Sequence, residues 1–382
     1  MYPRVEINLE AIKHNLRLLT TRCRSAGIDV AAVVKLVCGD PVLLKTVVDA
    51  GIDVIADSRL ENFQGLTGFS GKKLLLRLPM LSQVQQLVDT VDISLNSEIE
   101  IMRKIAATAR QKGKTHDIIL MLDLGDLREG IIDSDVLDGT IAELLTLEGI
   151  NLLGLGSNLT CFGGVMPSTK ALNKLITIKN QLETKFQLKL DVISGGNSGC
   201  LTLLDNGKLP VGVNQLRLGT SIFMGLGLND QQIPGLQYDN FILVTEIIEI
   251  MDKPSVPMGE IGLDASGKVP SFEDLGIRKK ALCAIGLQDI NYAYISALDK
   301  AIKILGMSSD HLVLDISDSS QAYVVGDKLK FQLSYQGVLS AMNSSYIYKY
   351  YHDGAQPWQL LANIALPANG PSAKRQHTIA HN

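Results

Sequence analysis

The sequence predicts an α/β protein in which a (β/α)8 barrel of the TIM type is followed by a mostly β domain. Two observations predict this fold class. Eight short apolar runs alternate with stretches that have helical periodicity or helix-start residues. From about Pro234 onward, strand-like runs are separated by segments rich in Gly, Pro, Asp and Ser. A doubly wound open sheet is the alternative for the first part, and the count of eight favours the barrel.

The first part begins with residues 2–8, which alternate as a short strand does, and Asn8 can then cap a helix. The apolar runs that we expect to form the barrel strands are residues 30–34, 52–56, 73–78, 91–95, 117–123, 150–156, 189–193 and 213–218. Their near-continuous Val, Ile and Leu content is typical of parallel strands that are covered on both faces. Helix starts are indicated between them, for example at Asp40-Pro41, Ser82 and Asn96-Ser97.

The second part contains strand-like runs at residues 241–251, 279–285, 311–317, 327–334 and 345–351. These runs predict a mostly antiparallel β domain. We therefore divide the chain into a barrel of residues 9–233 and a β-rich domain of residues 234–382, which also includes the N-terminal strand of residues 1–8. The polar tail from Asn369 is expected to be loose.

Composition and charge exclude several functional classes. Apolar residues make up 46% and charged residues 20% of the 382 residues, and the formal net charge is −4. With no run of Lys and Arg, that balance argues against nucleic acid or an anionic membrane as a partner. The longest apolar stretch, residues 241–251, contains two glutamates and is too short to span a bilayer. Five scattered cysteines form no CxxC pair, so no disulfide framework or metal site is indicated and the cytoplasm is the expected location.

Lys35 is the first candidate catalytic residue. It directly follows four small apolar residues at the end of the first predicted barrel strand. In barrels of this kind the chemistry takes place at the C-terminal ends of the strands. Partial desolvation there lowers the pKa of a lysine amine, which makes it a good nucleophile or Schiff-base former. A lysine that extends out to solvent is the structural alternative.

Three further strand ends carry candidate polar residues. Arg128 lies in a loop bounded by Gly125 and Gly130, and it is either aimed inward or held in a salt bridge within the loop. Asn158 follows the sixth strand, where it can hydrogen-bond a ligand or only stabilise its loop. Arg217 lies between two leucines of the eighth strand, and a buried arginine needs a partner.

The ends of strands seven and eight predict a phosphate site. Strand seven ends in SGGNSGC, where two glycines precede Asn197 and Ser198 at a helix start, so backbone N–H groups can bind an anion there. Strand eight ends in a second turn of this kind, with Gly219 and Thr220. Phosphate sites in these barrels often form from the loops after strands seven and eight. Combined with a Schiff-base lysine, the two turns describe a pyridoxal phosphate site.

The sequence resembles the alanine-racemase-type enzymes of pyridoxal phosphate fold type III, and within them the ornithine racemase branch most closely. The resemblance spans nearly the whole chain. The strings that carry it include VVKLVCGDP, ADSRLEN, MLDLGDLREG, NLTCFGG, SGGNSG and ILGMSSDHLVLD, in this order.

The resemblance implies a role for each matching residue. Lys35 would hold the cofactor and act as one of two bases, and Arg128 would lie near the cofactor's phenolic oxygen. Arg217 would hydrogen-bond the pyridine nitrogen and keep it unprotonated, which favours proton exchange over bond-breaking side reactions. The residues matched to phosphate contacts are Ser198, Gly219, Thr220 and Tyr350.

The sequence departs from the family at the second base and at Asn158, where the family has a histidine. Alanine racemases use a tyrosine in a Gly-Tyr-Ala-Asp stretch, and that stretch aligns here with residues 286–289, where Leu287 cannot move protons. Asp310 and His311 are the candidates because their segment resembles a stretch that faces the partner's active site in alanine racemases. His311 has the best unperturbed pKa for the task. Asp289 is a further candidate.

The sequence therefore predicts a pyridoxal-phosphate-dependent racemase of ornithine, which the resemblance implies to be a homodimer with shared active sites. The alternatives are a racemase of another specificity (alanine, lysine or broad), an aldolase or decarboxylase on the same cofactor, and a non-catalytic cofactor carrier. An aldolase would need a metal site, and the six histidines form no convincing cluster. A cationic substrate side chain needs an acidic partner, for which the candidates are Glu260, Asp264, Asp289 and Asp310.

Overall fold

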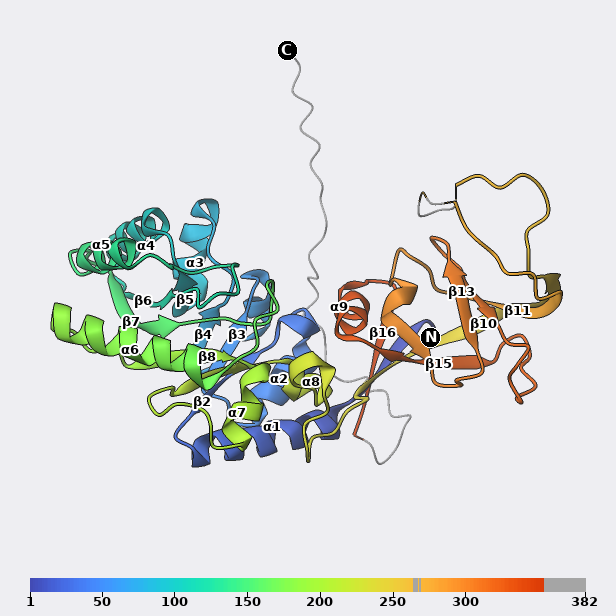
Figure 1. The fold of residues 1–382 in the computed structure, drawn as a ribbon, viewed down its shortest axis with the longest axis horizontal. Coiled ribbons are helices and arrows are strands. Elements are labelled where there is room, and N and C mark those ends of the chain that lie inside the picture. Colours follow the sequence, from blue (N-terminus) through green and yellow to red (C-terminus); the bar gives the residue numbers. More distant parts are fainter. Residues whose placement is uncertain (264–266, 268, 354–382) are drawn as a thin grey trace, which may run out of the picture.

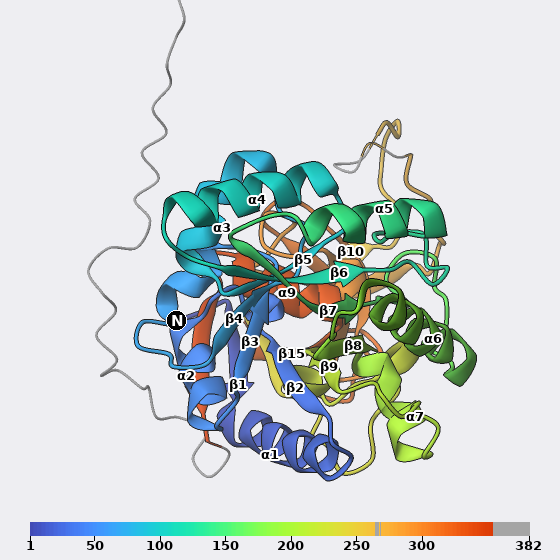
Figure 2. The same ribbon diagram turned by 90° about the vertical axis from the view of Figure 1, so that its left-hand side faces the viewer.

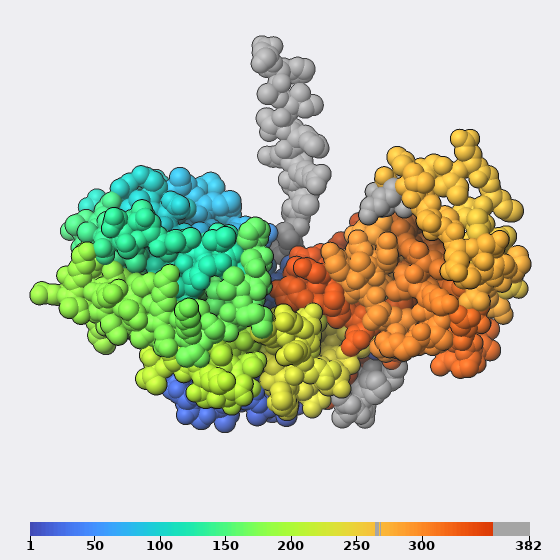
Figure 3. All heavy atoms as spheres, viewed as in Figure 1, coloured from blue at the N-terminus to red at the C-terminus, as the bar shows by residue number. Residues whose placement is uncertain are grey.

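The structure, a computed structural model, describes residues 1–263, 267 and 269–353. It has two parts that lie side by side in Figure 1, a barrel with its helices and a β domain. The space-filling view in Figure 3 shows the same two parts as separate lobes. Asp264 and the tail from Asn369 lie outside the described residues.

Eight parallel strands close into a barrel in sequence order, which confirms the predicted (β/α)8 fold. The strands are β2 (Asp29–Val33), β3 (Val54–Asp57), β4 (Lys72–Leu75), β5 (Ile93–Asn96), β6 (His116–Met121), β7 (Ile150–Gly156), β8 (Val192–Asn197) and β9 (Gln215–Leu218). The helices of this part are α1 (Leu9–Ser25), α2 (Pro41–Asp49), α3 (Val84–Thr90), α4 (Ile99–Gln111), α5 (Ser134–Leu144), α6 (Thr169–Phe186), α7 (Leu201–Asp205) and α8 (Thr220–Met224). Figure 2 shows these helices around the strands.

The predicted helix starts are confirmed at the two positions where capping was clearest. The side chain of Asn8 accepts a hydrogen bond from the backbone N–H of Ala11 at 3.1 Å, and α1 begins one residue after Asn8. The side chain of Asp40 accepts the backbone N–H groups of Val42 and Leu43, with Pro41 as the first helical residue of α2. Both caps satisfy donors that a helix leaves unpaired at its first turn.

The prediction was wrong at the end of the seventh barrel strand. Residues 189–193 were expected to be the strand, and its two glycines were expected to form the turn after it. Instead β8 runs from Val192 to Asn197, with Gly195 and Gly196 inside it. A Cβ at Gly195 would lie 2.5 Å from a methyl carbon of Val213. The glycine therefore permits close approach inside the barrel wall, a use that its sequence alone does not distinguish from a turn.

The β domain contains an eight-stranded sheet. Its strands are β10 (Phe241–Pro254), β11 (Ile277–Cys283), β12 (Ile295–Ala297), β13 (Lys303–Met307), β14 (Leu312–Asp315), β15 (Lys328–Leu333), β16 (Tyr348–His352) and β1 (Arg4–Asn8). The N-terminal strand β1 pairs with β10 in antiparallel and with β16 in parallel orientation. The short strands β12 and β13 and the helix α9 (Tyr335–Asn343) were not predicted, because each is brief.

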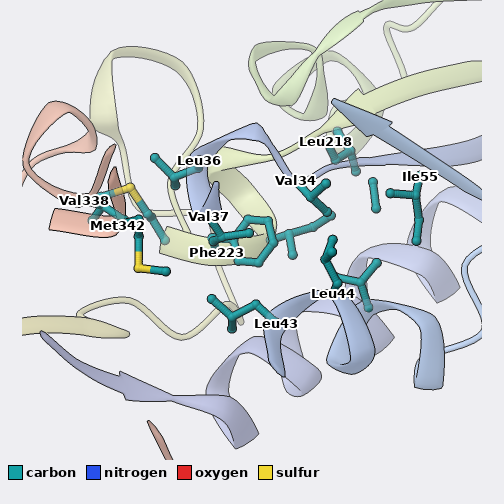
Figure 4. Packing of buried hydrophobic residues seen from close by; sticks show 14 of the residues in the cluster. Val34, Leu36, Val37, Leu43, Leu44, Ile55, Leu218, Phe223, Val338 and Met342 are labelled. Atoms are coloured by element: carbon teal, nitrogen blue, oxygen red, sulfur yellow. The ribbon is translucent and has the colours of Figure 1, made fainter. Parts of the chain in front are cut away.

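Helix α9 packs the β domain onto the barrel mouth. Figure 4 shows Val338 and Met342 of α9 beside Leu36 and Val37, and all four side chains are buried. Leu36 and Val37 belong to the short 3-10 helix η1 (Lys35–Val37) that follows strand β2. This contact fixes the backbone of the segment that carries Lys35, and it also brings the first residues of α9 to the mouth.

Candidate active site

A cavity of about 500 Å³ opens at the C-terminal ends of the barrel strands. This volume lies in the usual range of ligand sites. Its wall includes eight of the predicted site residues, namely Lys35, Arg128, Asn158, Asn197, Ser198, Arg217, Gly219 and Thr220. The structure therefore brings together residues of η1, β8 and β9 and of the segments that follow β6, β7, β8 and β9. Three predicted residues, Asp310, His311 and Tyr350, do not line this cavity.

Lys35 begins η1 directly beneath the cavity. Burial lowers the pKa of its amine, and the nearby guanidinium groups of Arg128 and Arg217 lower it further. Asp57, a fully buried carboxyl group at the end of β3, acts in the opposite direction. Within the described part of the chain the amine makes no hydrogen bond or ion pair, so it is available to a ligand.

Arg217 is a buried cation held by neutral groups. One of its Nη atoms donates to the backbone carbonyl of Ser157 at 2.6 Å, and the other donates to the carbonyl and hydroxyl of Ser194. Only 5% of the residue is exposed, and burial lowers the pKa of the guanidinium to about 10. Since no carboxylate among the described residues forms an ion pair with it, the arginine presents a positive charge to whatever fills the cavity.

The hydroxyl of Ser198 joins the ends of β8 and β9. Its Oγ lies 2.9 Å from the Oγ of Ser221 and accepts weak hydrogen bonds from the backbone N–H groups of Gly219 and Ser221. A Cβ at Gly219 would lie 3.1 Å from the backbone oxygen and the Cβ of Val33, so this turn tolerates only a small residue. The two turns that were predicted to bind a phosphate thus lie against each other on one wall of the cavity.

Asn158 and Asn197 lie side by side but have different surroundings. The side-chain nitrogen of Asn197 donates to the carbonyl of Leu159 at 2.9 Å, and its oxygen accepts the N–H of Gly199, so this residue ties two loops together. The side-chain nitrogen of Asn158 is buried, and it has no hydrogen-bond partner among residues 1–263, 267 and 269–353. A buried donor without a protein partner on a cavity wall is placed to bind an acceptor on a ligand or an ordered water.

Arg128 pairs with its neighbour Glu129 through two hydrogen bonds from the guanidinium to the carboxylate. Their loop is tightly held, because Asp123 accepts the N–H groups of Gly125 and Leu127. The two alternatives expected for Arg128, a side chain aimed inward and a salt bridge within the loop, both hold: the residue lines the cavity and is ion-paired with Glu129. Glu129 also lines the cavity, and its side chain is only 13% exposed.

Asp126 joins this loop to the loop after β7. Its buried carboxylate accepts four backbone N–H groups, those of Thr160, Cys161, Phe162 and Val165. Burial raises the pKa of the carboxyl group, but the four hydrogen bonds outweigh it and the net pKa lies below the ordinary value. Two loops that carry cavity residues are therefore held together by one side chain.

Tyr335, which the sequence analysis missed, takes the place at the cavity that was expected for Tyr350. Tyr335 is the first residue of α9 and lines the cavity, and burial raises the pKa of its hydroxyl to about 12, so the hydroxyl remains a donor. The ring of Tyr350 instead stacks under the guanidinium of Arg4, 4.6 Å from its carbon. The structure therefore does not bring Tyr350 to the expected position: the residue belongs to β16, which pairs with β1, and it does not line the cavity.

Asp310 and His311 are exposed in the turn between β13 and β14, where Asp310 accepts a hydrogen bond from Gln288 at 2.8 Å. The turn lies against residues 286–289, and a Cβ at Gly286 would lie 2.0 Å from the backbone oxygen of Ser309. The two stretches considered for the second base are thus one structural unit. This unit belongs to the β domain and does not reach the cavity of its own chain.

Among the described residues, no group of three or more His, Cys, Asp or Glu side chains is placed to hold a metal ion. No described helix has the length and apolar character needed to cross a membrane.

Comparison with known proteins assigns the family. The family model "Alanine racemase, N-terminal domain" matches residues 7–226, which is more than half of the chain. The chain belongs to the alanine racemase family. It is 41% identical to an ornithine racemase of Acetoanaerobium sticklandii over 350 residues, which cover 91% of this chain and 99% of that protein. It is 37% identical to a lysine racemase of Thermotoga maritima, with 92% of this chain and 99% of that protein covered.

Solved members of the alanine racemase family have the same fold. An alanine racemase from Bartonella henselae with covalently bound pyridoxal phosphate superimposes with a TM-score of 0.70, covering 91% of this chain and 99% of that one. The sequence identity is 16%, so this likeness establishes the fold alone. It agrees with the barrel and β domain described above.

Proposed function

We propose that this protein is a pyridoxal-phosphate-dependent amino-acid racemase that acts on basic amino acids, with ornithine as its preferred substrate. The observation that carries the proposal is the placement of Lys35, an amine of lowered pKa, in one cavity with the two turns at Ser198 and Gly219. The names of two relatives that match over nearly the whole chain, an ornithine and a lysine racemase, support the choice of substrate.

The residues of the cavity fit pyridoxal phosphate. The turns at Ser198 and Gly219 would hold the phosphate, and the amine of Lys35 would bond the aldehyde carbon. Arg217 would face the ring nitrogen, and the unpaired side-chain nitrogen of Asn158 would find an acceptor on the cofactor. Tyr335 replaces Tyr350 in the proposed phosphate contacts, because only Tyr335 lies on the wall.

The chain's own groups account for proton exchange at the α-carbon. When bound, pyridoxal phosphate supplies an aldehyde that links to an amine and withdraws electrons from the α-carbon of a linked amino acid. The amine of Lys35 lies on one wall of the cavity, and burial lowers its pKa, so it would take and return the α-proton on its own face of the substrate. Arg217 would face the ring nitrogen with its positive charge and disfavour protonation of that nitrogen, which would favour return of the proton over other outcomes.

A second base must act on the opposite face of the substrate, and we propose that the partner subunit of a homodimer supplies it from Asp310 or His311. Both residues are exposed and lie outside the cavity of their own chain. A head-to-tail dimer would allow the β domain of one subunit to cover the barrel mouth of the other. We further propose a cytoplasmic location, since all five cysteines are free.

The test is racemisation of a panel of L-amino acids by the purified, cofactor-loaded protein, followed by chiral chromatography. We expect ornithine and lysine to lose optical purity faster than alanine or serine. If alanine is the preferred substrate, the specificity is wrong and the racemase assignment stands. If no amino acid is racemised while the cofactor remains bound through Lys35, the protein is a cofactor carrier instead.

A further inference from the structure

The walls of the active-site cavity carry two carboxylates, Glu129 and Asp230, among the described residues. Neither was among the acidic residues considered from the sequence. The cations on the same walls are Lys35, Arg128 and Arg217. A substrate with a positively charged side chain needs a carboxylate that is not already neutralised, so the partners of these two acids decide which of them can bind it.

Glu129 is already paired. Both of its carboxylate oxygens accept hydrogen bonds from the guanidinium of Arg128, and only 13% of its side chain is exposed. Taking Glu129 for the substrate would leave Arg128 without its anion beside two other cations. The carboxylate of Glu129 therefore holds Arg128 in place.

Asp230 has no such partner. Within the described part of the chain its side chain makes no hydrogen bond and no ion pair, although it lies on the wall of a cavity that contains three cations. Asp230 also lies on the wall of a neighbouring cavity of about 350 Å³. The two cavities share two wall residues, Asp230 and Tyr335. Asp230 is exposed and thus lies at the rim, where the two cavities meet.

The backbone around Asp230 is held in one conformation. Gly227 donates to the carbonyl of Gln231 at 2.8 Å, and Gln231 donates back to the carbonyl of Leu228 at 3.0 Å. Asn229 and Asp230 both have left-handed backbone conformations, with φ values of 50° and 56°. This tight turn follows α8, whose first residue, Thr220, belongs to the proposed phosphate site. The position of Asp230 relative to the cofactor site is therefore fixed by a short, bonded segment.

The acidic residues considered from the sequence lie elsewhere in this chain. Asp289 accepts a hydrogen bond from the hydroxyl of Ser344 at 2.7 Å, Asp310 accepts one from Gln288, and Glu260 is exposed in the loop between β10 and β11. None of these three lines the cavity. Only contribution from a partner subunit could bring them to the substrate.

We propose that Asp230 is the specificity-determining carboxylate that receives the distal ammonium group of a diamino acid substrate. This inference rests on the proposed racemase function and names the residue that selects the substrate class. The carboxylate accepts the ammonium as a charge-assisted hydrogen bond. Substrates that lack the distal amine leave Asp230 solvated and gain nothing from it.

The experiment compares ornithine with norvaline, which has the same carbon chain and no distal amine. For each variant, kcat and KM are measured for both substrates with the cofactor-loaded protein. In Asp230→Asn we expect the ratio of kcat/KM for ornithine over norvaline to fall about tenfold, mainly through a higher KM for ornithine. Asp29→Asn is the matched control, because Asp29 is an exposed aspartate at the start of β2, the opposite end of the barrel.

Three results would overturn the inference. The first is an unchanged ratio of kcat/KM for ornithine over norvaline in Asp230→Asn. The second is an equal fall of this ratio in Asp29→Asn. The third is a fall in Asp310→Asn and not in Asp230→Asn, which would assign recognition to the partner subunit's Asp310. Binding of the cofactor, followed by its absorbance, shows whether Asp230→Asn is folded and loaded. If the unmodified protein racemises neither substrate, the proposed function fails, and that failure is separate from any result with the variants.

Discussion

The carboxylate of Asp126 accepts the backbone N–H of Cys161 at 3.1 Å, across a gap between two loops that carry residues of the active-site cavity. Three more N–H groups of the same loop converge on this carboxylate. We expect Asp126→Asn to lower the free energy of unfolding by about 2 kcal/mol, because the amide loses charge and replaces one acceptor oxygen by a donor. Urea denaturation measures the change, and Glu148→Gln, an exposed change, should stay within about 0.5 kcal/mol of the unmodified protein.

The same carboxylate predicts a pH dependence of stability. The pKa of Asp126 is lowered in the folded protein. Its contribution to the free energy of unfolding is therefore fully present above the pKa of the unfolded chain, about 3.9, and is lost as the pH falls through the pKa of the folded protein. The stability difference between the unmodified protein and Asp126→Asn should therefore be constant near neutral pH and shrink below about pH 4. Denaturation series at several pH values measure it. A difference that grows on acidification contradicts the assignment.

Removal of the Lys35 amine should abolish covalent attachment of the cofactor. In Lys35→Ala we expect racemisation to fall by about 10³-fold or more, since both attachment and one base are lost. Reduction with borohydride and peptide mass spectrometry should place the cofactor on Lys35 in the unmodified protein and on no lysine in the variant. Lys349→Ala serves as the control, because Lys349 is a half-buried lysine of lowered pKa that does not line the cavity. Labelling of another lysine in the unmodified protein would refute the assignment of Lys35.

The two tyrosines should respond differently to loss of the hydroxyl group. Tyr335→Phe is expected to weaken cofactor affinity about tenfold or more, because a hydroxyl that donates to a phosphate forms a charge-assisted bond. Tyr350→Phe should leave the affinity within about twofold, since its ring packs on Arg4 outside the cavity. Titration of the cofactor-free protein with pyridoxal phosphate distinguishes the two. Equal effects would return Tyr350 to the proposed site.

Shared active sites predict complementation between two inactive variants. Lys35→Ala lacks the base on one face, and a double Asp310→Ala, His311→Ala variant lacks the proposed base on the other. When the two are mixed and allowed to exchange subunits, half of the dimers are hybrids, and one of the two sites in each hybrid is intact. Activity should therefore recover to about a quarter of the unmodified value. No recovery, although subunit exchange is shown by mass measurement, would place the second base within one subunit.

Most of the barrel could be predicted from the sequence because each strand is a continuous apolar run and each helix start has its own local signal. Asp40, for example, caps α2 through bonds that span only three residues. The strand after Leu190 was misplaced because a glycine used for close packing resembles a glycine used for a turn. Helix α9 was missed since its stability comes from packing on η1 and not from its own composition.

The site was partly predictable for the same reason. Lys35, Ser198 and Gly219 lie at strand ends, and a barrel gathers strand ends at one face. Tyr335 and Asp230 carry no such signal. Their place at the cavity depends on how the β domain packs on the barrel and on a turn after α8, and neither contact is encoded near the residues themselves. Glu129 could have been found as the acidic neighbour of Arg128.

Strand β1 has a consequence for how the chain is made. Residues 4–8 are synthesised before any of the barrel, yet their partners are β10 and β16, which emerge from the ribosome only after the barrel is complete. Until then both edges of β1 are open to pairing with other chains. Helix α1 follows without a linker and is anchored to the barrel through Asn15, which bonds the carbonyl of Ile222. The nascent barrel therefore keeps an unpaired strand beside it, and β16, the last strand among the described residues, covers one of the edges of that strand.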